Sequence, residues 1–214
     1  SASTTQGNYR WRNDDGDLTS SGATWREGLN QNTSIDKNAN VRIRFELYYS
    51  GGESDGPDET DIGLFYTVKD DENWVEITKD GNNAFVISPS TYYDDTDITD
   101  DPANSLLTNT VVDPPNTFGG GYAIDDAITQ NFTTYDGYYY ESEYCFKTTE
   151  NAQEGVTYEM RLAAGEGYWS YDRNPELTIT ADIPLSNVAI YLVVLLIIGF
   201  YGFKLFVSRF SLTK

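Results

Sequence analysis

A strict alternation of apolar and polar side chains between Val41 and Tyr49 limits most strongly what this chain can fold into. Arginine, glutamate and tyrosine fill the positions between the apolar residues. A period of two puts all the apolar side chains on one face of an extended strand, whereas a helix would scatter them around its circumference. The pattern therefore predicts a β-strand with one face in a core and the other face toward solvent.

The same period recurs along the chain around Leu64, Tyr140, Met160 and Ile179, and clusters of Gly, Asp, Asn and Pro separate these segments. Residues 79–83 form such a cluster and predict a hairpin between the strands on either side of it. No segment before residue 183 has a sustained helical period. We therefore predict an all-β domain with the strand spacing of a β-sandwich.

Residues 88–121 interrupt the strand pattern with four prolines and few strand signals. Loops of this length are usually functional or form an extra lobe. We predict that residues 1–182 form one β-sandwich ectodomain that carries this segment as a long loop insertion. Two separate domains are the less favoured interpretation.

Residues 183–203 contain 21 consecutive uncharged side chains, mostly Leu, Ile, Val and Phe. At about 1.5 Å per residue, a helix of this length would cover the hydrocarbon core of a bilayer, which is about 30 Å thick. We predict one C-terminal transmembrane α-helix over 183–207, and a buried helix of a soluble domain is the alternative. Five residues mark the predicted span: Ile183, Leu192, Leu195, Gly199 and Phe203.

Charge on the two flanks of this segment predicts its orientation. Lys204, Arg209 and Lys214 follow it, and Asp182 precedes it. Basic flanks stay in the cytoplasm, so residues 208–214 would form a short basic cytoplasmic tail. The first 182 residues would then lie outside, at the cell surface or in the periplasm, and the reverse topology is less favoured. The start at Ser1 is typical of signal-peptide cleavage, although an arbitrary chain boundary is equally compatible with it.

Composition argues against several functions. The whole chain has a net charge of −20, and the first 182 residues have eleven bases against 34 acids, which gives −23. Such a surface repels nucleic acid, so we predict no nucleic-acid partner. The chain has no histidine, which is the commonest general base. Its single cysteine, Cys145, allows no intrachain disulfide and is expected to be a buried structural thiol. We therefore predict that the protein is not an enzyme.

Clustered aspartates are the most suggestive polar feature. Calcium takes six to eight oxygen ligands, which acidic loops can supply from carboxylates and backbone carbonyls. We predict Ca²⁺ as the candidate ligand and expect no other cofactor, whereas plain solvated acidic turns are the alternative. The candidate metal ligands are Asp14, Asp15, Asp17, Asp94, Asp95 and Asp97.

Aromatic side chains are dense at two places and predict a binding or interface surface. The alternative is that they fill the core. Three consecutive tyrosines cannot all point inward from a strand, so Tyr139 should face away from the core if its neighbours face into it. The candidates are Tyr138, Tyr139, Tyr140, Tyr168, Trp169 and Tyr171. Asn32 and Asn131 begin N-glycosylation triplets.

Several sequence segments, among them Ala-Thr-Trp at residues 23–25 and Arg-Ile-Arg at 42–44, carry a resemblance to known proteins. Tyr-Arg-Trp-Arg-Asn-Asp-Asp-Gly at residues 9–16, Tyr-Cys-Phe-Lys at 144–147 and Asn-Pro-Glu-Leu at 174–177 resemble a β-domain of bacterial surface proteins known mainly from environmental genomes. The resemblance implies an Ig-like, Greek-key sandwich and a surface location, and it implies no reaction. Residues 183–200 are similar to the anchoring segments of the IPTL-CTERM and PEP-CTERM group.

These observations together predict a non-enzymatic, membrane-anchored structural protein of the cell surface or envelope, a subunit of a layer or filament. Its expected partners are membrane lipid, through the C-terminal helix, and copies of itself or other subunits. The alternatives are an accessory subunit of a larger membrane complex and a binding module for carbohydrate or for another cell.

Overall fold

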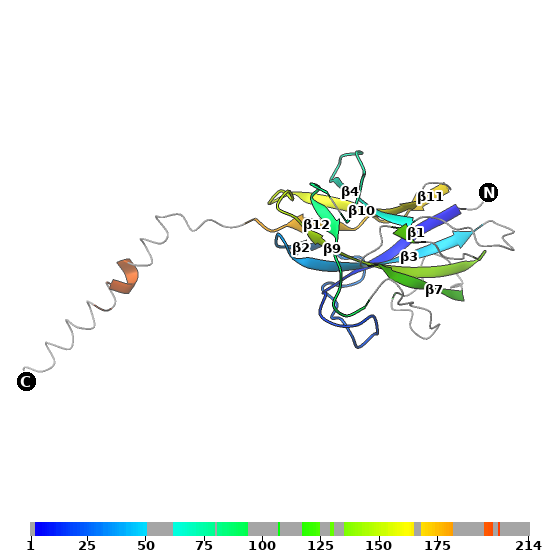
Figure 1. Ribbon diagram of the computed structural model, residues 1–214, viewed down its shortest axis with the longest axis horizontal. Coiled ribbons are helices and arrows are strands. Elements are labelled where there is room, and N and C mark those ends of the chain that lie inside the picture. The colour runs from blue at the N-terminus through cyan, green and yellow to red at the C-terminus, as the bar shows by residue number, and fades with distance from the viewer. Residues whose placement is uncertain are drawn as a thin grey trace, which may run out of the picture. The chain divides into compact units, whose positions relative to one another are not determined.

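The computed structural model describes residues 3–50, 62–79, 81–93, 107, 117–124, 129–130, 135–164, 168–181, 195–198 and 201 (Figure 1). The chain divides into two compact units, Ser1–Thr180 and Ala181–Lys214. All the strands of the described residues belong to the first unit.

Six strands form the first sheet, and β3 and β9 are its longest members. The sheet order is β11–β1–β3–β9–β6, and β7 also pairs with β9, in parallel. Strand β11 joins the edge of β1 in parallel, whereas β3 runs antiparallel to both of its neighbours, β1 and β9. The strands are β1 (Ser3–Arg12), β3 (Asn40–Ser50), β6 (Phe85–Ile87), β7 (Thr117–Ile124), β9 (Tyr138–Thr148) and β11 (Tyr168–Tyr171).

The second sheet also has six strands, in the order β2–β12–β10–β4–β5, with β8 paired to β4. In Figure 1 strands β4 and β10 lie above β3 and β7, so the two sheets form two layers. The predicted all-β sandwich is therefore confirmed for the first unit. The strands are β2 (Thr33–Ile35), β4 (Ile62–Val68), β5 (Val75–Glu76), β8 (Thr129–Gln130), β10 (Thr157–Ala164) and β12 (Glu176–Ile179).

The core between the layers is built by the alternation seen in the sequence. Ile43 and Phe45 of β3 are fully buried, as are Leu64 of β4 and Met160 of β10, and they belong to one continuous hydrophobic cluster. Phe85 lies at its centre, with its ring 5.0 Å from Tyr158 and 5.8 Å from Phe146, both edge to face. Such perpendicular pairs are the favoured geometry for aromatic rings. The core therefore rests on interdigitated rings from both sheets.

The second face of β3 is buried as well, which corrects the prediction of a half-exposed strand. Arg42, Arg44 and Glu46 have no exposed surface. Residues 13–32 and 88–93 contribute to the cover over this face: the Leu18 carbonyl accepts a hydrogen bond from Arg44, and the ring of Tyr93 lies over Arg42. The alternation predicted which side chains share a face, but the long connections decide whether that face meets water.

The interpretation of residues 88–121 as loop throughout is wrong at its C-terminal end, where strand β7 begins. The three consecutive glycines, 119–121, indicate loop by composition, yet they lie inside β7. A Cβ atom at Gly119 would lie 2.4 Å from the ring of Tyr140, so only glycine permits the observed approach. The hairpin predicted at residues 79–83 is also wrong, because β5 pairs in the second sheet and β6 in the first.

The prediction of a transmembrane helix is also wrong. Within the described ranges, no helix is long and apolar enough to cross a membrane. Helix is found at residues 195–198 and at 201, where Leu195 has 63% of its surface exposed. Hydropathy measures transfer to lipid and says little about helix length, and this stretch is rich in Val, Ile and Gly, which are weaker helix formers. The other predicted span residues, Ile183, Leu192, Gly199 and Phe203, lie outside the described residues.

Candidate functional site

Four side chains from three separate parts of the chain form a continuous stack at one side of the sandwich. The guanidinium carbon of Arg161 lies 4.0 Å from the ring centroid of Trp74 and 5.1 Å from that of Tyr171. The rings of Tyr171 and Trp169 follow, with centroids 6.3 Å apart and planes inclined by 21°. We call these residues, Trp74, Arg161, Tyr171 and Trp169, the aromatic row. Each is half-buried, so each keeps part of its surface in contact with solvent.

The fold brings these residues together at an edge of β10. Strand β12 pairs with β10 only from Thr157 to Glu159, and the rest of this edge is not covered by β12. The Tyr171 hydroxyl donates a hydrogen bond to the Leu162 carbonyl at 3.0 Å, on that remaining stretch. Arg161 is the neighbour of Leu162, and its side chain points away from the core because alternate residues of β10 are buried. The ring of Tyr171 is thereby held beside the guanidinium.

Trp74 reaches the row from the tight connection that follows β4. Asp70 adopts a left-handed backbone conformation with φ of 67°, and the Asp71 carboxylate accepts a hydrogen bond from the Asn73 amide at 3.1 Å. Thr67 donates to the Asp71 carbonyl at 3.1 Å. Aspartate tolerates this conformation better than most residues and caps turns through its side chain. These contacts fix the turn that presents the indole.

Gln6 joins the two sheets immediately beneath the row. Its side chain is fully buried, donates to the Arg173 carbonyl at 2.7 Å and accepts from the Leu162 amide at 2.8 Å. The pairing of β1 with β3 shifts register between Gln6 and Tyr9, which is a β-bulge. A bulge re-aims side chains relative to a regular strand. Gln6 thus ties β1 to β10 and to the segment that follows β11.

Arg161 is chemically unusual among the arginines of the described residues. It donates no hydrogen bond and forms no ion pair within the described part of the chain, and its Nε is buried without an acceptor. Each other described arginine donates at least one hydrogen bond, as Arg26 does to Ser34 and Arg173 to Asn8. Arg10, Arg26 and Arg173 likewise form no ion pair among the described residues, but each of them donates a hydrogen bond, whereas Arg161 does neither. Stacking holds this guanidinium in place while its terminal nitrogens stay uncommitted.

A second polar feature lies buried on the outer face of the first sheet. Glu143 contacts three arginines: Arg12 at 3.2 Å, Arg44 at 2.6 Å and Arg42 at 3.6 Å. Arg44 also pairs with Glu141 at 2.9 Å, and Arg42 pairs with Asp14. Three guanidinium groups are therefore matched by three carboxylates. We call this set, Arg12, Arg42, Arg44, Asp14, Glu141 and Glu143, the ionic cluster.

The protonation of the buried carboxyls follows from these contacts. Burial alone would raise the pKa of Glu143, but Arg44 and Arg12 hold it below its ordinary value. Glu46 lies just outside the ionic cluster and forms no ion pair among the described residues. Burial raises the pKa of Glu46 to about 7, although a hydrogen bond from Asn8 at 3.2 Å opposes the shift. Glu143 therefore stays charged near neutral pH, whereas Glu46 can carry a proton there.

The predicted tyrosines divide between the core and the covered outer face. Tyr140 is buried in the core, and Tyr138 packs against it. Tyr139 faces the other way, as predicted, but it is also buried, with its ring 5.1 Å from Phe118 of β7. Tyr139 and Tyr140 are therefore buried, Tyr138 is half-buried, and Trp169 and Tyr171 enter the aromatic row. Tyr168 lies in β11 beside them in sequence.

The predicted calcium ligands that are described serve other purposes. Asp14 is a member of the ionic cluster and also accepts hydrogen bonds from Asn40 and Ser90. Asp15 accepts from the amide and hydroxyl of Thr24, and Asp17 does the same for Thr19. The described residues contain no group of three or more acids or cysteines placed to hold a metal ion. The remaining candidates, Asp94, Asp95 and Asp97, lie outside the described residues.

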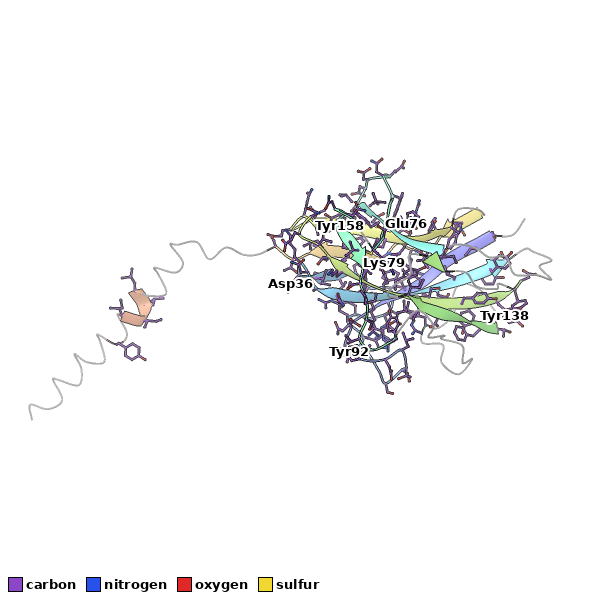
Figure 2. The ribbon with its side chains drawn as sticks, viewed as in Figure 1. Asp36, Glu76, Lys79, Tyr92, Tyr138 and Tyr158 are labelled. Carbon is purple, nitrogen blue, oxygen red and sulfur yellow. The ribbon has the colours of Figure 1, made fainter. Side chains whose placement is uncertain are left out.

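The other sequence predictions concern single residues. Cys145 is a free, buried thiol, as expected. Asn32 is exposed, and its side-chain oxygen accepts from the Tyr9 hydroxyl at 2.7 Å, while Asn131 lies outside the described residues. Figure 2 shows the contrast between surface and interior tyrosines: Tyr92 lies at the outside of the cover over the first sheet, and Tyr158 lies within the sandwich.

Sequence reasoning missed Trp74 and Arg161, which supply half of the aromatic row. Neither residue stands in a motif, and 86 positions separate them in the chain. A signal for Arg161 existed in the alternation of β10, which puts it on the outer face with Glu159. No family model, curated protein or solved structure matches this chain.

Proposed function

We propose that this protein is a non-catalytic recognition domain of a surface protein and that it binds carbohydrate along the aromatic row. The row carries the proposal because it offers flat, half-exposed rings next to uncommitted hydrogen-bond donors. Aromatic rings stack on the apolar faces of sugar rings, and polar groups beside them bind hydroxyls and fix the orientation. Trp74 and Trp169 are the two largest rings of the row and supply this platform.

The rigidity of the row supports binding over a purely structural role for these rings. Tyr171 is fixed through the Leu162 carbonyl, and Gln6 fixes the strand beneath it. A surface that is already ordered loses little conformational entropy when a ligand binds. The row is therefore suited to hold a ligand without rearrangement.

The proposal contains no catalytic step. The chain has no histidine, and the carboxylates buried in the ionic cluster are engaged by arginines. A carboxylate held charged by guanidinium groups is a poor proton donor or acceptor near neutral pH. The cell-surface location expected from the resemblance is part of this proposal.

Assembly into a layer or filament, which the sequence analysis favoured, has weaker support from the described edges. Among the described edge strands, β2, β5, β6, β8 and β11 have two to four residues, and β7 is the exception with eight. Short edge strands offer few free backbone groups to a second copy and limit edge-to-edge pairing. Recognition through the aromatic row therefore ranks first.

The test is binding of the full chain to an array of immobilised glycans, followed by titration calorimetry with the best oligosaccharide. Trp74→Ala should weaken binding at least about tenfold, as expected for a central aromatic contact. Tyr92→Ala is the matched control, because Tyr92 is an aromatic residue with 47% of its surface exposed and lies outside the row. Circular dichroism would confirm that both variants fold. Absence of binding to every glycan, or equal affinity of Trp74→Ala and wild type, would overturn the proposal.

A further inference from the structure

The chemistry of Arg161 narrows the class of carbohydrate, on the premise that the aromatic row is the binding site proposed above. We infer that the row binds an acidic saccharide and that Arg161 receives the carboxylate of a uronic-acid-type sugar whose ring stacks on a neighbouring indole. A guanidinium offers its donors in a planar fork that matches the two oxygens of a carboxylate. Arg161 is the described arginine whose fork is unused.

Stacking between two rings makes Arg161 a prepared receptor. Trp74 covers one side of the guanidinium at 4.0 Å and Tyr171 lies at 5.1 Å. A long arginine side chain normally loses considerable rotamer freedom when it is fixed by a ligand. Here the stack has already removed that freedom, so the carboxylate meets donors whose position is set. Such preorganisation increases affinity by reducing the entropy lost on binding.

Charge complementarity favours an acidic sugar over a neutral one at this place. A neutral sugar would leave the positive charge of Arg161 without a counter-charge, in a half-buried position between two rings. A carboxylate supplies that charge together with two acceptors, and hydrogen bonds to charged groups are the stronger kind. The inference is therefore specific for a charged substituent and not merely for a sugar ring.

The net charge of the protein restricts the acidic ligand further. The first 182 residues carry a net charge of −23. This charge repels a long polyanion at distances up to about the Debye length, which is about 8 Å at physiological ionic strength. A contact ion pair with Arg161 acts at close range and is screened far less. The structure therefore favours short or sparsely charged acidic glycans over dense polyuronates.

The experiment compares short oligogalacturonides with their methyl-esterified forms, titrated into the full chain. Esterification removes the charge and leaves the sugar rings in place, so it isolates the carboxylate. Wild type should bind the acid at least about tenfold more tightly than the ester, within the range for a charged hydrogen-bonded pair. Arg161→Gln should abolish that preference, so that acid and ester bind with similar affinity. Arg161→Lys keeps the charge but loses the fork, and it should retain only part of the preference.

The outcomes separate this inference from the proposed function. Equal binding of acid and ester, with both weakened by Trp74→Ala, would overturn the carboxylate preference and leave carbohydrate binding standing. Binding of neutral glycans in the array without any binding of oligogalacturonides would do the same. Failure of every saccharide to bind would overturn the proposed function itself. An acid preference that survives in Arg161→Gln would place the carboxylate elsewhere and overturn the role of Arg161.

Discussion

Glu46 on β3 and Glu141 on β9 lie directly opposite each other in the first sheet, and neither has any exposed surface. Like charges at facing positions destabilise a strand pair. The charge of Glu141 is compensated by an ion pair with Arg44 at 2.9 Å and by a hydrogen bond from the Leu107 amide at 2.8 Å. Glu46 has only the Asn8 amide on one oxygen, and its Oε1 is buried without a partner. The two facing glutamates therefore differ in their partners: Glu141 is ion-paired, whereas Glu46 is not.

This relationship predicts how stability depends on pH. The pKa of Glu46 is raised to about 7 in the folded protein, whereas an unfolded glutamate titrates near 4.3. A raised carboxyl pKa stabilises the fold fully below the unfolded pKa, and this stabilisation is lost as pH rises through the folded pKa. The loss should approach about 3 kcal/mol of unfolding free energy by about pH 8. Urea unfolding of the wild type at about pH 5, 6, 7 and 8 measures it.

Glu46→Gln is the control for this pH effect, because the amide keeps the shape and cannot ionise. Its stability should change much less than that of the wild type between about pH 5 and pH 8. Glu143 and Asp14 of the ionic cluster should not contribute to the change in stability between about pH 5 and pH 8. Their pKa values are lowered, so their effect on stability appears at acidic pH. Parallel pH profiles for wild type and variant would contradict the assignment.

Glu143 is predicted to be the most sensitive residue of the ionic cluster. Glu143→Gln would leave the surrounding guanidinium groups with an uncompensated buried charge. Breaking a buried pair from one side costs roughly 3 to 5 kcal/mol. Chemical denaturation measures the loss of unfolding free energy, and the midpoint should fall without a change in slope.

Glu154→Gln is the matched control for the ionic cluster, because Glu154 pairs with Lys37 at 3.6 Å where both side chains are partly exposed. An exposed pair of this kind contributes about 1 kcal/mol or less. Comparable losses in the two variants would show that the ionic cluster does not behave as a buried network.

The sequence correctly predicted which face of a strand a side chain occupies, where the alternation of residue types matches the observed burial. The alternation at Ile43 and Phe45 predicted the core face of β3, and the argument from consecutive tyrosines put Tyr139 on the opposite face. Both inferences depend only on strand geometry, which fixes side chains two residues apart on one face. These parts of the fold could be read directly from the chain.

The missed features depend on contacts between distant segments. Nothing near Arg42 indicates that residues 88–93 contribute to its cover, and nothing near Trp74 indicates that Arg161 will stack on it. The failed hairpin at residues 79–83 has the same origin, since turn residues cannot show whether the chain stays in one sheet or crosses to the other. The transmembrane prediction rested on the length, apolarity and flanking charges of residues 183–203, and none of these determines the length of a helix.

Gln6 is predicted to support both the stability of the sandwich and the aromatic row. Gln6→Ala would leave the buried Leu162 amide without its acceptor, whereas the carbonyl of the exposed Arg173 can turn to water. An unsatisfied buried group costs about 1 to 3 kcal/mol, so we expect a loss of this size. Because Tyr171 bonds to the Leu162 carbonyl, carbohydrate affinity should fall as well. Thermal unfolding and glycan titration measure the two effects.

Gln153→Ala is the comparison for Gln6, because the Gln153 side chain is exposed and its contacts are made by the backbone. It should change unfolding free energy by less than about 0.5 kcal/mol. A Gln6→Ala protein as stable as Gln153→Ala would show that Gln6 does not hold the two sheets together.

Gly119 is predicted to be intolerant of any side chain, because β7 packs closely on Tyr140. An added Cβ would come within 2.4 Å of the Tyr140 ring, and the ring cannot move freely, since its hydroxyl accepts from the Tyr135 amide at 2.7 Å. Gly119→Ala should therefore cost about 1 to 3 kcal/mol through overpacking. Denaturant unfolding measures this loss. In a Tyr140→Leu background the clash is relieved, so the added cost of Gly119→Ala should be smaller there. Equal costs in the two backgrounds would show that contact with Tyr140 is not the reason for the glycine.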